Sequence, residues 1–280
     1  ELATRSEQAV LTDSIQIDPY HVWVSEIMLQ QTRVAAVIPY FLRWIERFPS
    51  VSALANATQD EVNELWAGLG YYRRAANLRK GAQTIMKDFN GKLPDTVSEL
   101  KKIPGIGDYT AGAVASIAFK KAVPLVDGNV IRVLARVRAV KANKGNPKFV
   151  KHVWSLAREL VSPEYPADFN QGIMELGATI CKPKSPNCAL CPIKDICHAY
   201  QEVNKQRRPL SIEYDLEGSA KECDFCQEED IDSEDKSSGT VMQYPSKFIK
   251  KKPREEHVAV GVVICTLDKA AATQNSDNDI

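Results

Sequence analysis

The sequence predicts a mainly α-helical protein across residues 18–205. Apolar residues recur there at the spacing of amphipathic helices, short segments rich in glycine or proline separate these stretches, and the alternation typical of strands is scarce. The expected helices cover residues 20–33, 34–48, 60–67, 72–89, 96–103, 109–120, 128–139, 147–161 and 167–180.

Charge is unevenly distributed along the 280 residues. Residues 1–208 carry 28 lysines and arginines against 20 acidic side chains, whereas residues 209–280 carry 8 against 16. The basic excess of the first part suits a polyanionic partner, although an ordinary solvated surface explains it equally well. No apolar run is long enough to cross a membrane, and the N-terminus lacks the pattern of a secretory signal.

The first expected helix begins at Asp18 and Pro19, because aspartate caps a helix well and proline suits its first position. This helix contains Glu26 among mostly apolar neighbours. Burial would raise the pKa of that carboxyl group, as a general acid at neutral pH requires. The alternative, a surface glutamate on an amphipathic helix, is usually the better interpretation of a single Glu.

A glycine-rich turn at residues 104–107 predicts a helix–hairpin–helix motif between two helical stretches. Gly105 and Gly107 would allow the tight turn and let a phosphate approach the free N–H groups of the next helix. A plain corner between two helices is the alternative. About twenty residues later, Asp127 precedes another helix, so a helix cap is the simpler interpretation and a carboxylate facing a substrate the alternative.

The most informative pattern is a group of four cysteines, Cys181, Cys188, Cys191 and Cys197, on a segment broken by prolines. Thiolates select zinc or an iron–sulfur cluster. Structural zinc sites usually pair two short knuckles, and this segment has one knuckle with two outlying cysteines, which favours the cluster. A disulfide framework is the remaining alternative, although such frameworks are typical of small secreted domains.

The character of the chain changes after the helical region. Low hydrophobicity and segregated charge predict a flexible linker over residues 206–256. The basic cluster at 250–254 suits a nuclear-localisation signal and a solvated patch equally well. Residues 257–267 then alternate like a β-strand. One strand cannot make a sheet, so a second domain is expected to begin there.

Six motifs in order give the chain a family resemblance over residues 18–205. They are VSEIMLQQTRV, LWAGLGYYRR, IPGIGDYTAGA, VDGNVIRVLARV, FNQGIMELGA and the four-cysteine pattern, and they resemble the MutY-type adenine DNA glycosylases of the endonuclease III superfamily. The resemblance implies a helix–hairpin–helix DNA glycosylase fold with a 4Fe–4S cluster on the four cysteines. Its parts would be a six-helix barrel (18–133), an iron–sulfur subdomain (134–205, with any helix from 1–17), an interdomain connector (206–256) and the first strand of a truncated Nudix-like domain (257–280).

The resemblance also implies an activity. The chain would act in base-excision repair, hydrolysing the N-glycosidic bond of an adenine mispaired with 8-oxoguanine or guanine after flipping that base out of the duplex. Glu26 matches the residue that protonates adenine and activates water, and Asp127 matches the carboxylate that stabilises the sugar cation. Tyr109 and Asn129 match residues that position these groups.

The expected DNA contacts follow from the same resemblance. Gln31 and Tyr71 match side chains wedged into the base stack beside 8-oxoguanine, and Gln171 lies where relatives have a residue near the adenine. The full set of expected DNA- or base-binding residues is Gln30, Gln31, Thr32, Tyr71, Gly105, Gly107, Gln171, Lys182 and Lys184.

One position distinguishes two kinds of enzyme within the superfamily. Bifunctional relatives carry a lysine just after the hairpin turn, and its amine attacks the sugar to form a Schiff base. Tyr109 occupies this place and cannot do so. The resemblance therefore implies a monofunctional glycosylase without lyase activity.

The sequence departs from the family at three places. One is the Nudix-like domain, which is cut to its first strand, so 8-oxoguanine selectivity is expected to suffer. VLTDSIQ precedes Asp18 where relatives have a Leu-Pro-Trp-Arg segment, so part of the adenine pocket is expected to be missing. The alternative function is accordingly a catalytically impaired fragment that binds DNA or a partner. Cys223 and Cys226 lie where animal relatives bind zinc in the connector, although Leu216 replaces a further cysteine of that site.

The expected partners are duplex DNA with A:8-oxoguanine or A:G mispairs, and base-excision-repair and damage-checkpoint proteins bound through the connector. We expect a monomer that does not associate with membranes. The expected compartment is the nucleus, with the mitochondrion as a second candidate.

Overall fold

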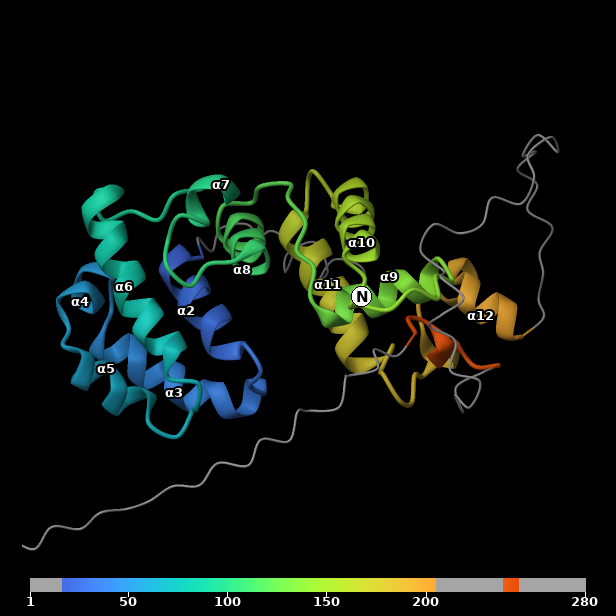
Figure 1. Ribbon diagram of the computed structural model, residues 1–280, viewed down its shortest axis with the longest axis horizontal. Coiled ribbons are helices and arrows are strands. Elements are labelled where there is room, and N and C mark those ends of the chain that lie inside the picture. Colours follow the sequence, from blue (N-terminus) through green and yellow to red (C-terminus); the bar gives the residue numbers. More distant parts are fainter. Residues whose placement is uncertain (1–16, 205–238, 247–280) are drawn as a thin grey trace, which may run out of the picture. The chain divides into compact units, whose positions relative to one another are not determined.

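The computed structural model describes residues 17–204 and 239–246, and within these residues it contains helices and no strand (Figure 1). The first helices are α2 (Pro19–Leu29), α3 (Val34–Arg47), α4 (Val51–Asn56), α5 (Gln59–Trp66), α6 (Arg73–Asp88), α7 (Val97–Leu100) and α8 (Asp108–Ala113), which continues as the π-helix η1 (Val114–Ala118). They are followed by α9 (Gly128–Val137), α10 (Pro147–Leu160), α11 (Pro166–Thr179) and α12 (His198–Val203). Short 3₁₀ turns are η2 (Cys188–Leu190), η3 (Lys194–Ile196) and η5 (Val241–Gln243).

The helical fold class is confirmed, and all nine expected helices are present. The expected helix 20–33 ends earlier, at Leu29, because Gln31 has a φ of 58° that a right-handed helix cannot contain. The stretch 96–103 forms only the single turn α7. Helices α4 and α12 were not expected, because six residues are too few to establish a helical period.

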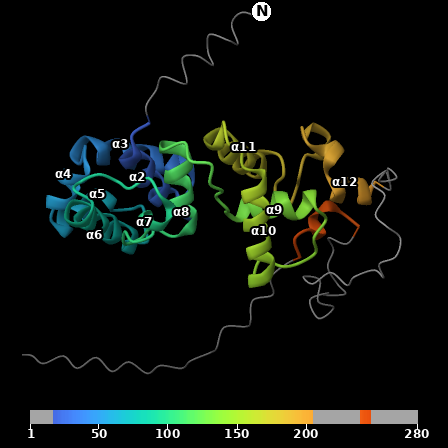
Figure 2. The ribbon, with the colours of Figure 1, turned by 90° about the horizontal axis from the view of Figure 1, so that it is seen from above.

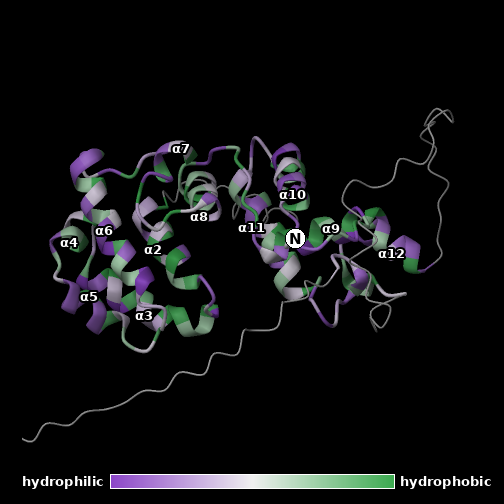
Figure 3. Ribbon diagram, in the orientation of Figure 1, coloured by the Kyte–Doolittle hydropathy of each residue, from purple (hydrophilic) through white to green (hydrophobic). Residues whose placement is uncertain are grey.

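Helix α2 lies at the centre of the first group of helices. It contacts α3, α6, α8 and η1, and most of its residues are buried. In Figure 3 green hydrophobic positions alternate along α2 with pale and purple ones, whereas α5 is mostly purple. Three tryptophans, Trp23, Trp44 and Trp66, are fully buried in the core around it. A helix that is apolar on nearly all sides must be buried, so any carboxylate on α2 enters the protein interior.

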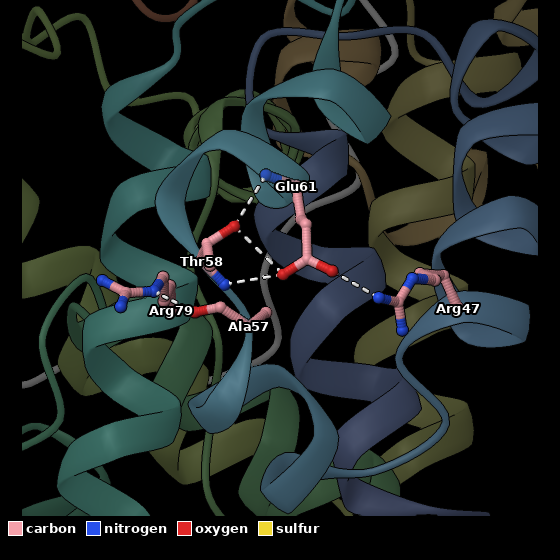
Figure 4. Close-up of polar contacts among 5 residues, drawn as sticks. All are labelled: Arg47, Ala57, Thr58, Glu61 and Arg79. Atoms are coloured by element: carbon pink, nitrogen blue, oxygen red, sulfur yellow. Dashed lines mark hydrogen bonds and ion pairs between the residues drawn. The ribbon is translucent and has the colours of Figure 1, made fainter.

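Helix α5 shows how local sequence fixes an element beside this core (Figure 4). Thr58 Oγ1 accepts from the backbone N–H of Glu61, and the Thr58 N–H donates back to Glu61 Oε2 at 2.8 Å, which makes a capping box. The other carboxylate oxygen of Glu61 pairs with Arg47 of α3. Arg79 of α6 donates to the Ala57 carbonyl at 2.6 Å, so three helices are held at one end of α5.

Helix α9 organises the second group of helices and contacts α10, α11 and α12 (Figure 2). Asn146 caps α10, and Pro147 occupies its first position. Helix α11 also contacts η1 and thereby joins the second group to the first. The two groups meet where α11 packs on η1, the continuation of the helix that carries Tyr109.

Part of the expected connector packs against the second group. Val241 and Tyr244 are buried against Ala199 of α12, in a small apolar cluster that also includes Cys188 and Cys197. Residues 204 and 239 therefore both lie on this group, although 34 intervening residues (205–238) are outside the described part of the chain. The remaining connector, residues 1–16 and the expected strand at 257–267 also lie outside it, so the four domain boundaries stay predictions. Among the described helices, none is long and apolar enough to span a membrane.

Candidate active site

Glu26 lies on the buried helix α2, and its side chain is 8% exposed. The hydroxyl group of Tyr109, from α8, donates to Glu26 Oε2 at 2.7 Å. The expectation of a buried carboxyl group is therefore correct, and the alternative of a surface glutamate is wrong, because α2 is apolar around nearly its whole circumference.

The surroundings of Glu26 favour its protonated form. Burial raises the pKa of the Glu26 carboxyl, the hydrogen bond from Tyr109 opposes this rise, and the negative charge of Asp127 adds to it. Burial and the same two carboxylates raise the pKa of Tyr109, so this hydroxyl remains a donor. Glu26 thus has the environment of a general acid.

Asp127 is the N-cap of α9, as the simpler interpretation predicted. Its Oδ1 accepts from the backbone N–H groups of Asn129 at 2.9 Å and Val130 at 2.8 Å. Its Oδ2 accepts from Asn129 Nδ2 at 2.8 Å. The carboxylate also acts electrostatically on Glu26 and Tyr109. Asp127 is therefore a helix cap whose charge acts on Glu26 and Tyr109, and a role toward a substrate stays a prediction.

Arg132 supports Asn129 and was not singled out from the sequence. Its Nη2 donates to Asn129 Oδ1 at 2.7 Å and to the Gly177 carbonyl at 2.8 Å, and its Nε donates to the Cys181 carbonyl at 2.8 Å. A continuous chain of hydrogen bonds thus connects Cys181 to Asp127. The only sequence signal was the spacing of Asn129 and Arg132, which places them on one face of α9.

Helix α11 packs behind both halves of the site. A Cβ atom added at Gly177 would lie 2.6 Å from Asn129 Cβ, so only glycine allows this approach. Met174 Sδ lies 3.5 Å from the Tyr109 hydroxyl. The expected adenine contact Gln171 is exposed one turn earlier on α11, and its amide donates to the Ala167 carbonyl of the same helix.

The two expected wedge residues lie on neighbouring segments. Gln31 follows α2 and Tyr71 precedes α6; both are exposed and both have positive φ, 58° and 51°. Gln30 is half-buried, and its amide lies 3.5 Å from Thr110 Oγ1 of α8. Thr32 donates from its hydroxyl to the Gln30 carbonyl at 3.3 Å.

The glycine-rich turn lies at the start of α8. Gly105 has a φ of +86°, as a tight turn requires, and an added Cβ would meet Asn77 at 2.8 Å. Gly107 is the N-cap of α8, is exposed, and has no protein atom within 4 Å of a hypothetical Cβ. The turn is therefore formed as predicted, with open space in front of Gly107.

The four cysteines surround one cavity. They are free of disulfides and line it together with Arg136 and several aliphatic side chains. Among the described residues, no three side chains are grouped as a site for a single metal ion. Four thiols around a shared space are the ligand set of a 4Fe–4S cluster, and the guanidinium Nη1 of Arg136 lies 3.3 Å from Cys181 Sγ, where it would hydrogen-bond to a cluster ligand. Lys182 and Lys184 are exposed beside Cys181.

The segment 239–246 closes one side of this cavity. Val241 is part of the cavity wall, and the Tyr244 carbonyl accepts from Arg136 Nε at 3.0 Å. The Tyr244 hydroxyl donates to Glu202 Oε2 at 2.6 Å. These contacts fix Arg136 between the first cysteine and the returning connector. Cys223 and Cys226, the expected zinc ligands, lie outside the described residues.

The cysteine segment and the helical region match two known families. Residues 24–159 match the family described as HhH-GPD superfamily base excision DNA repair protein, and residues 181–197 match the iron–sulfur binding domain of endonuclease III. The second match agrees with a 4Fe–4S cluster on the four cysteines.

Curated relatives are adenine DNA glycosylases. Those of Mus musculus and Homo sapiens are 46% and 43% identical, over 87% and 93% of this chain and 48% of each relative. That of Schizosaccharomyces pombe is 45% identical over 86% of this chain and 52% of the relative. The chain thus spans about half the length of these relatives.

Solved structures show the same fold. A thermostable thymine-DNA glycosylase matches with a TM-score of 0.62 and 28% identity, over 68% of this chain and 87% of that protein. A trapped covalent intermediate of endonuclease III with DNA matches with a TM-score of 0.59 and 23% identity, over 72% of this chain and 95% of that protein. The helix–hairpin–helix glycosylase fold expected from the sequence is therefore confirmed.

The packing of α11 on Asn129 gives a first prediction. Gly177→Ala should destabilise the protein by about 1–3 kcal/mol, because the new methyl group overlaps Asn129 Cβ. Gly172→Ala, on the same helix with open space around it, is the matched control and should stabilise by up to about 1 kcal/mol. Urea unfolding of both variants measures these changes. Equal free energies of unfolding for the two variants would show that α11 does not pack tightly against Asn129.

A second prediction concerns the cover of the cysteine cavity. In protein that holds its cluster, Tyr244→Ala should let an iron chelator withdraw iron several times faster, because the buried ring packed in one cluster with Cys188 and Cys197 is removed, while the backbone carbonyl that accepts from Arg136 stays. Tyr244→Phe keeps the buried ring and removes the hydroxyl that donates to Glu202, so it should stay close to the native rate. Chelator absorbance over time gives the rates. Identical iron loss from all three proteins would contradict a covering role.

Proposed function

The chain is a homologue of the MutY-type adenine DNA glycosylases and has the helix–hairpin–helix glycosylase fold, and on that premise we propose that it releases adenine from DNA by hydrolysing the N-glycosidic bond. The observation that carries this proposal is the buried Glu26, hydrogen-bonded to Tyr109 and close enough to Asp127 for that charge to act on both. Two carboxyl groups in different environments can divide acid and charge-stabilising roles.

The proposed reaction begins with the protonated Glu26. Its carboxylic acid gives a proton to a ring nitrogen of the flipped adenine, the bond from that base to the sugar breaks, and neutral adenine leaves. The Asp127 carboxylate stabilises the positive charge that develops on the sugar. The ionised Glu26 then takes a proton from the attacking water, which restores the acid.

The neighbouring residues position these two groups. Tyr109 fixes one oxygen of Glu26 by its hydrogen bond, and Asn129 fixes Oδ2 of Asp127. Arg132 in turn orients the Asn129 amide, because Asn129 Oδ1 accepts from the guanidinium. A 4Fe–4S cluster on the four cysteines would hold the Cys181 loop, whose carbonyl group anchors Arg132.

The proposed substrate is duplex DNA in which adenine is paired with 8-oxoguanine or guanine. Gln31 and Tyr71 are supported as wedge residues by their exposure on adjacent segments. Gly105 and Gly107 would receive a backbone phosphate at the hairpin, and Lys182 and Lys184 would contact phosphates beside the cluster. Gln30 and Thr32 flank Gln31 between α2 and α3, and Gln171 lies on α11, the helix that packs on Asn129.

We further propose that repair and damage-checkpoint proteins bind the connector, that its cysteine pair takes part in a zinc site, and that the protein acts as a monomer in the nucleus, with the mitochondrion as a second compartment. These proposals rest on the sequence. A fluorescent fusion, with and without the basic cluster at 250–254, tests the nuclear assignment: unchanged localisation would contradict a signal there.

The acid role of Glu26 gives the next prediction. Glu26→Gln should slow adenine release from an A:8-oxoguanine duplex by at least about 10²–10⁴-fold, because the amide can accept from Tyr109 but cannot transfer a proton. Binding of the same duplex should persist. Single-turnover release and gel-shift binding measure the two effects. Glu46→Gln, at an exposed position of α3, is the control and should match the native rate.

The same assay separates the enzyme from an impaired binding fragment. Release of adenine by the native chain, lost in Glu26→Gln, supports the enzyme. Duplex binding without release by the native chain would instead identify a fragment that binds DNA or a partner.

Because Tyr109 lacks an amine, we also expect no lyase activity. Borohydride added during base release should trap no covalent complex between protein and DNA, since a trapped complex requires a lysine Schiff base. Denaturing gels of labelled duplex measure it. Efficient trapping through a specific lysine would contradict the monofunctional assignment.

A further inference from the structure

Arg74 is a buried arginine at the start of α6 and is 9% exposed. Its two terminal nitrogens bind two segments of chain that lie about forty residues apart in sequence. Nη1 donates to the carbonyl groups of Ile27 (3.1 Å), Met28 (2.9 Å) and Gln30 (2.5 Å), whereas Nη2 donates to the carbonyl groups of Leu69 (3.4 Å) and Gly70 (3.2 Å) and to Thr32 Oγ1 (3.3 Å).

A planar guanidinium suits the carbonyl groups at the end of α2 and in the turn before α6. The last carbonyl groups of α2 have no partner within the helix and form the negative end of its dipole. The planar fork of an arginine can serve both segments at once, while a lysine ammonium is a compact point charge. One guanidinium therefore ties the end of α2 to the turn before α6.

Aromatic rings enclose the same group. The guanidinium carbon lies 5.2 Å from the ring centre of Trp66 and 5.4 Å from that of Tyr71. The Trp66 indole N–H donates to the Gly70 carbonyl at 2.8 Å, which holds the turn from the other side. The buried guanidinium thus lies against Tyr71, a residue that is itself 63% exposed.

Each of the two segments contains one residue with a strained backbone. Gln31 and Tyr71 both adopt the left-handed backbone conformation, which is unfavourable for residues other than glycine. Such conformations persist when surrounding contacts leave no alternative. Arg74 donates to the residues on either side of Gln31, Gln30 and Thr32. It also donates to the two residues before Tyr71, Leu69 and Gly70.

We propose that Arg74 is a positioning residue that makes the segments Gln30–Thr32 and Leu69–Tyr71 a single rigid unit. The proposal rests on the proposed function, in which Gln31 and Tyr71 enter the base stack beside the lesion. Arg74 fixes the backbone of both segments before DNA arrives, so the two side chains enter together and little ordering is left to occur on binding. Recognition of 8-oxoguanine then depends on a residue that is not itself assigned a DNA contact.

The test is a double-mutant cycle on Arg74→Lys, Gln31→Ala and Tyr71→Ala. Dissociation constants are measured for duplexes with 8-oxoguanine opposite 2′-fluorodeoxyadenosine, whose fluorine slows cleavage, and for the same duplex without the lesion. Arg74→Lys should reduce the preference for the lesion by about tenfold, the size of coupling found between contacting residues. Combining it with Gln31→Ala or Tyr71→Ala should add little to the larger single effect.

Arg79→Lys is the matched control. Arg79 is also on α6 and donates to a backbone carbonyl, that of Ala57 at 2.6 Å (Figure 4), but it does not contact either segment. Its substitution should leave the preference for the lesion unchanged. Hydrogen exchange gives a second measure: in Arg74→Lys, protection should fall together in residues 30–32 and 69–71 and stay native elsewhere in α2 and α6. If Arg74→Lys unfolds, Arg74→Gln replaces it.

The outcomes distinguish the positioning role of Arg74 from the wedge role of Gln31 and Tyr71. Native lesion preference in Arg74→Lys, or effects of the single changes that simply add, would overturn the positioning role while leaving the wedge assignment intact. Unchanged lesion preference in both Gln31→Ala and Tyr71→Ala would overturn the wedge assignment itself, and the positioning role with it. Sub-additive losses together with joint loss of protection support the proposal.

Discussion

The hydrogen bond from Tyr109 to Glu26 is the interaction on which the candidate site depends, because it joins two helices across the buried interior. Glu26 belongs to a helix most of whose residues are buried, and Tyr109 follows the hairpin turn 83 residues later. The bond can form only if the tryptophan core places α2 against α8. It satisfies a carboxyl group that burial would otherwise leave without a partner, and it fixes the direction in which that group can act.

The Asp127 carboxylate is held mainly by hydrogen bonds at the N-terminus of α9. Asp127 is immobilised as a helix cap, so the backbone of α9 fixes one oxygen and the Asn129 amide fixes the other. Arg132 connects that amide to the carbonyl group of Cys181. Changes at the cysteine centre can therefore reach Asp127 through two side chains without altering the core around α2.

The helices, their caps and the cysteine group could be predicted from the sequence, whereas contacts between distant segments could not. The helices follow from periodicity, the Asp18 and Asp127 caps follow from local chemistry, and the four cysteines follow from their spacing. The burial of Glu26 was open, because one sequence cannot show which face of an apolar helix meets solvent. Arg74 and Arg132 were missed because their partners lie on other segments, and a long-range hydrogen bond leaves no local pattern. Residues 239–246 were assigned to a flexible linker because eight residues with average polarity give no sign of the surface on which they pack.

The central claim is that the interior holds Glu26 with a raised pKa, and a direct titration of that carboxyl group tests it. Carbon NMR of protein with ¹³C-labelled glutamate side-chain carboxyls, with the Glu26 signal assigned by its absence in Glu26→Gln, follows protonation of this one residue. We predict a midpoint clearly above about 4.3, the ordinary value for glutamate, because burial outweighs the hydrogen bond from Tyr109. A midpoint at or below that ordinary value would mean that Glu26 is fully ionised at neutral pH, and it would contradict the account.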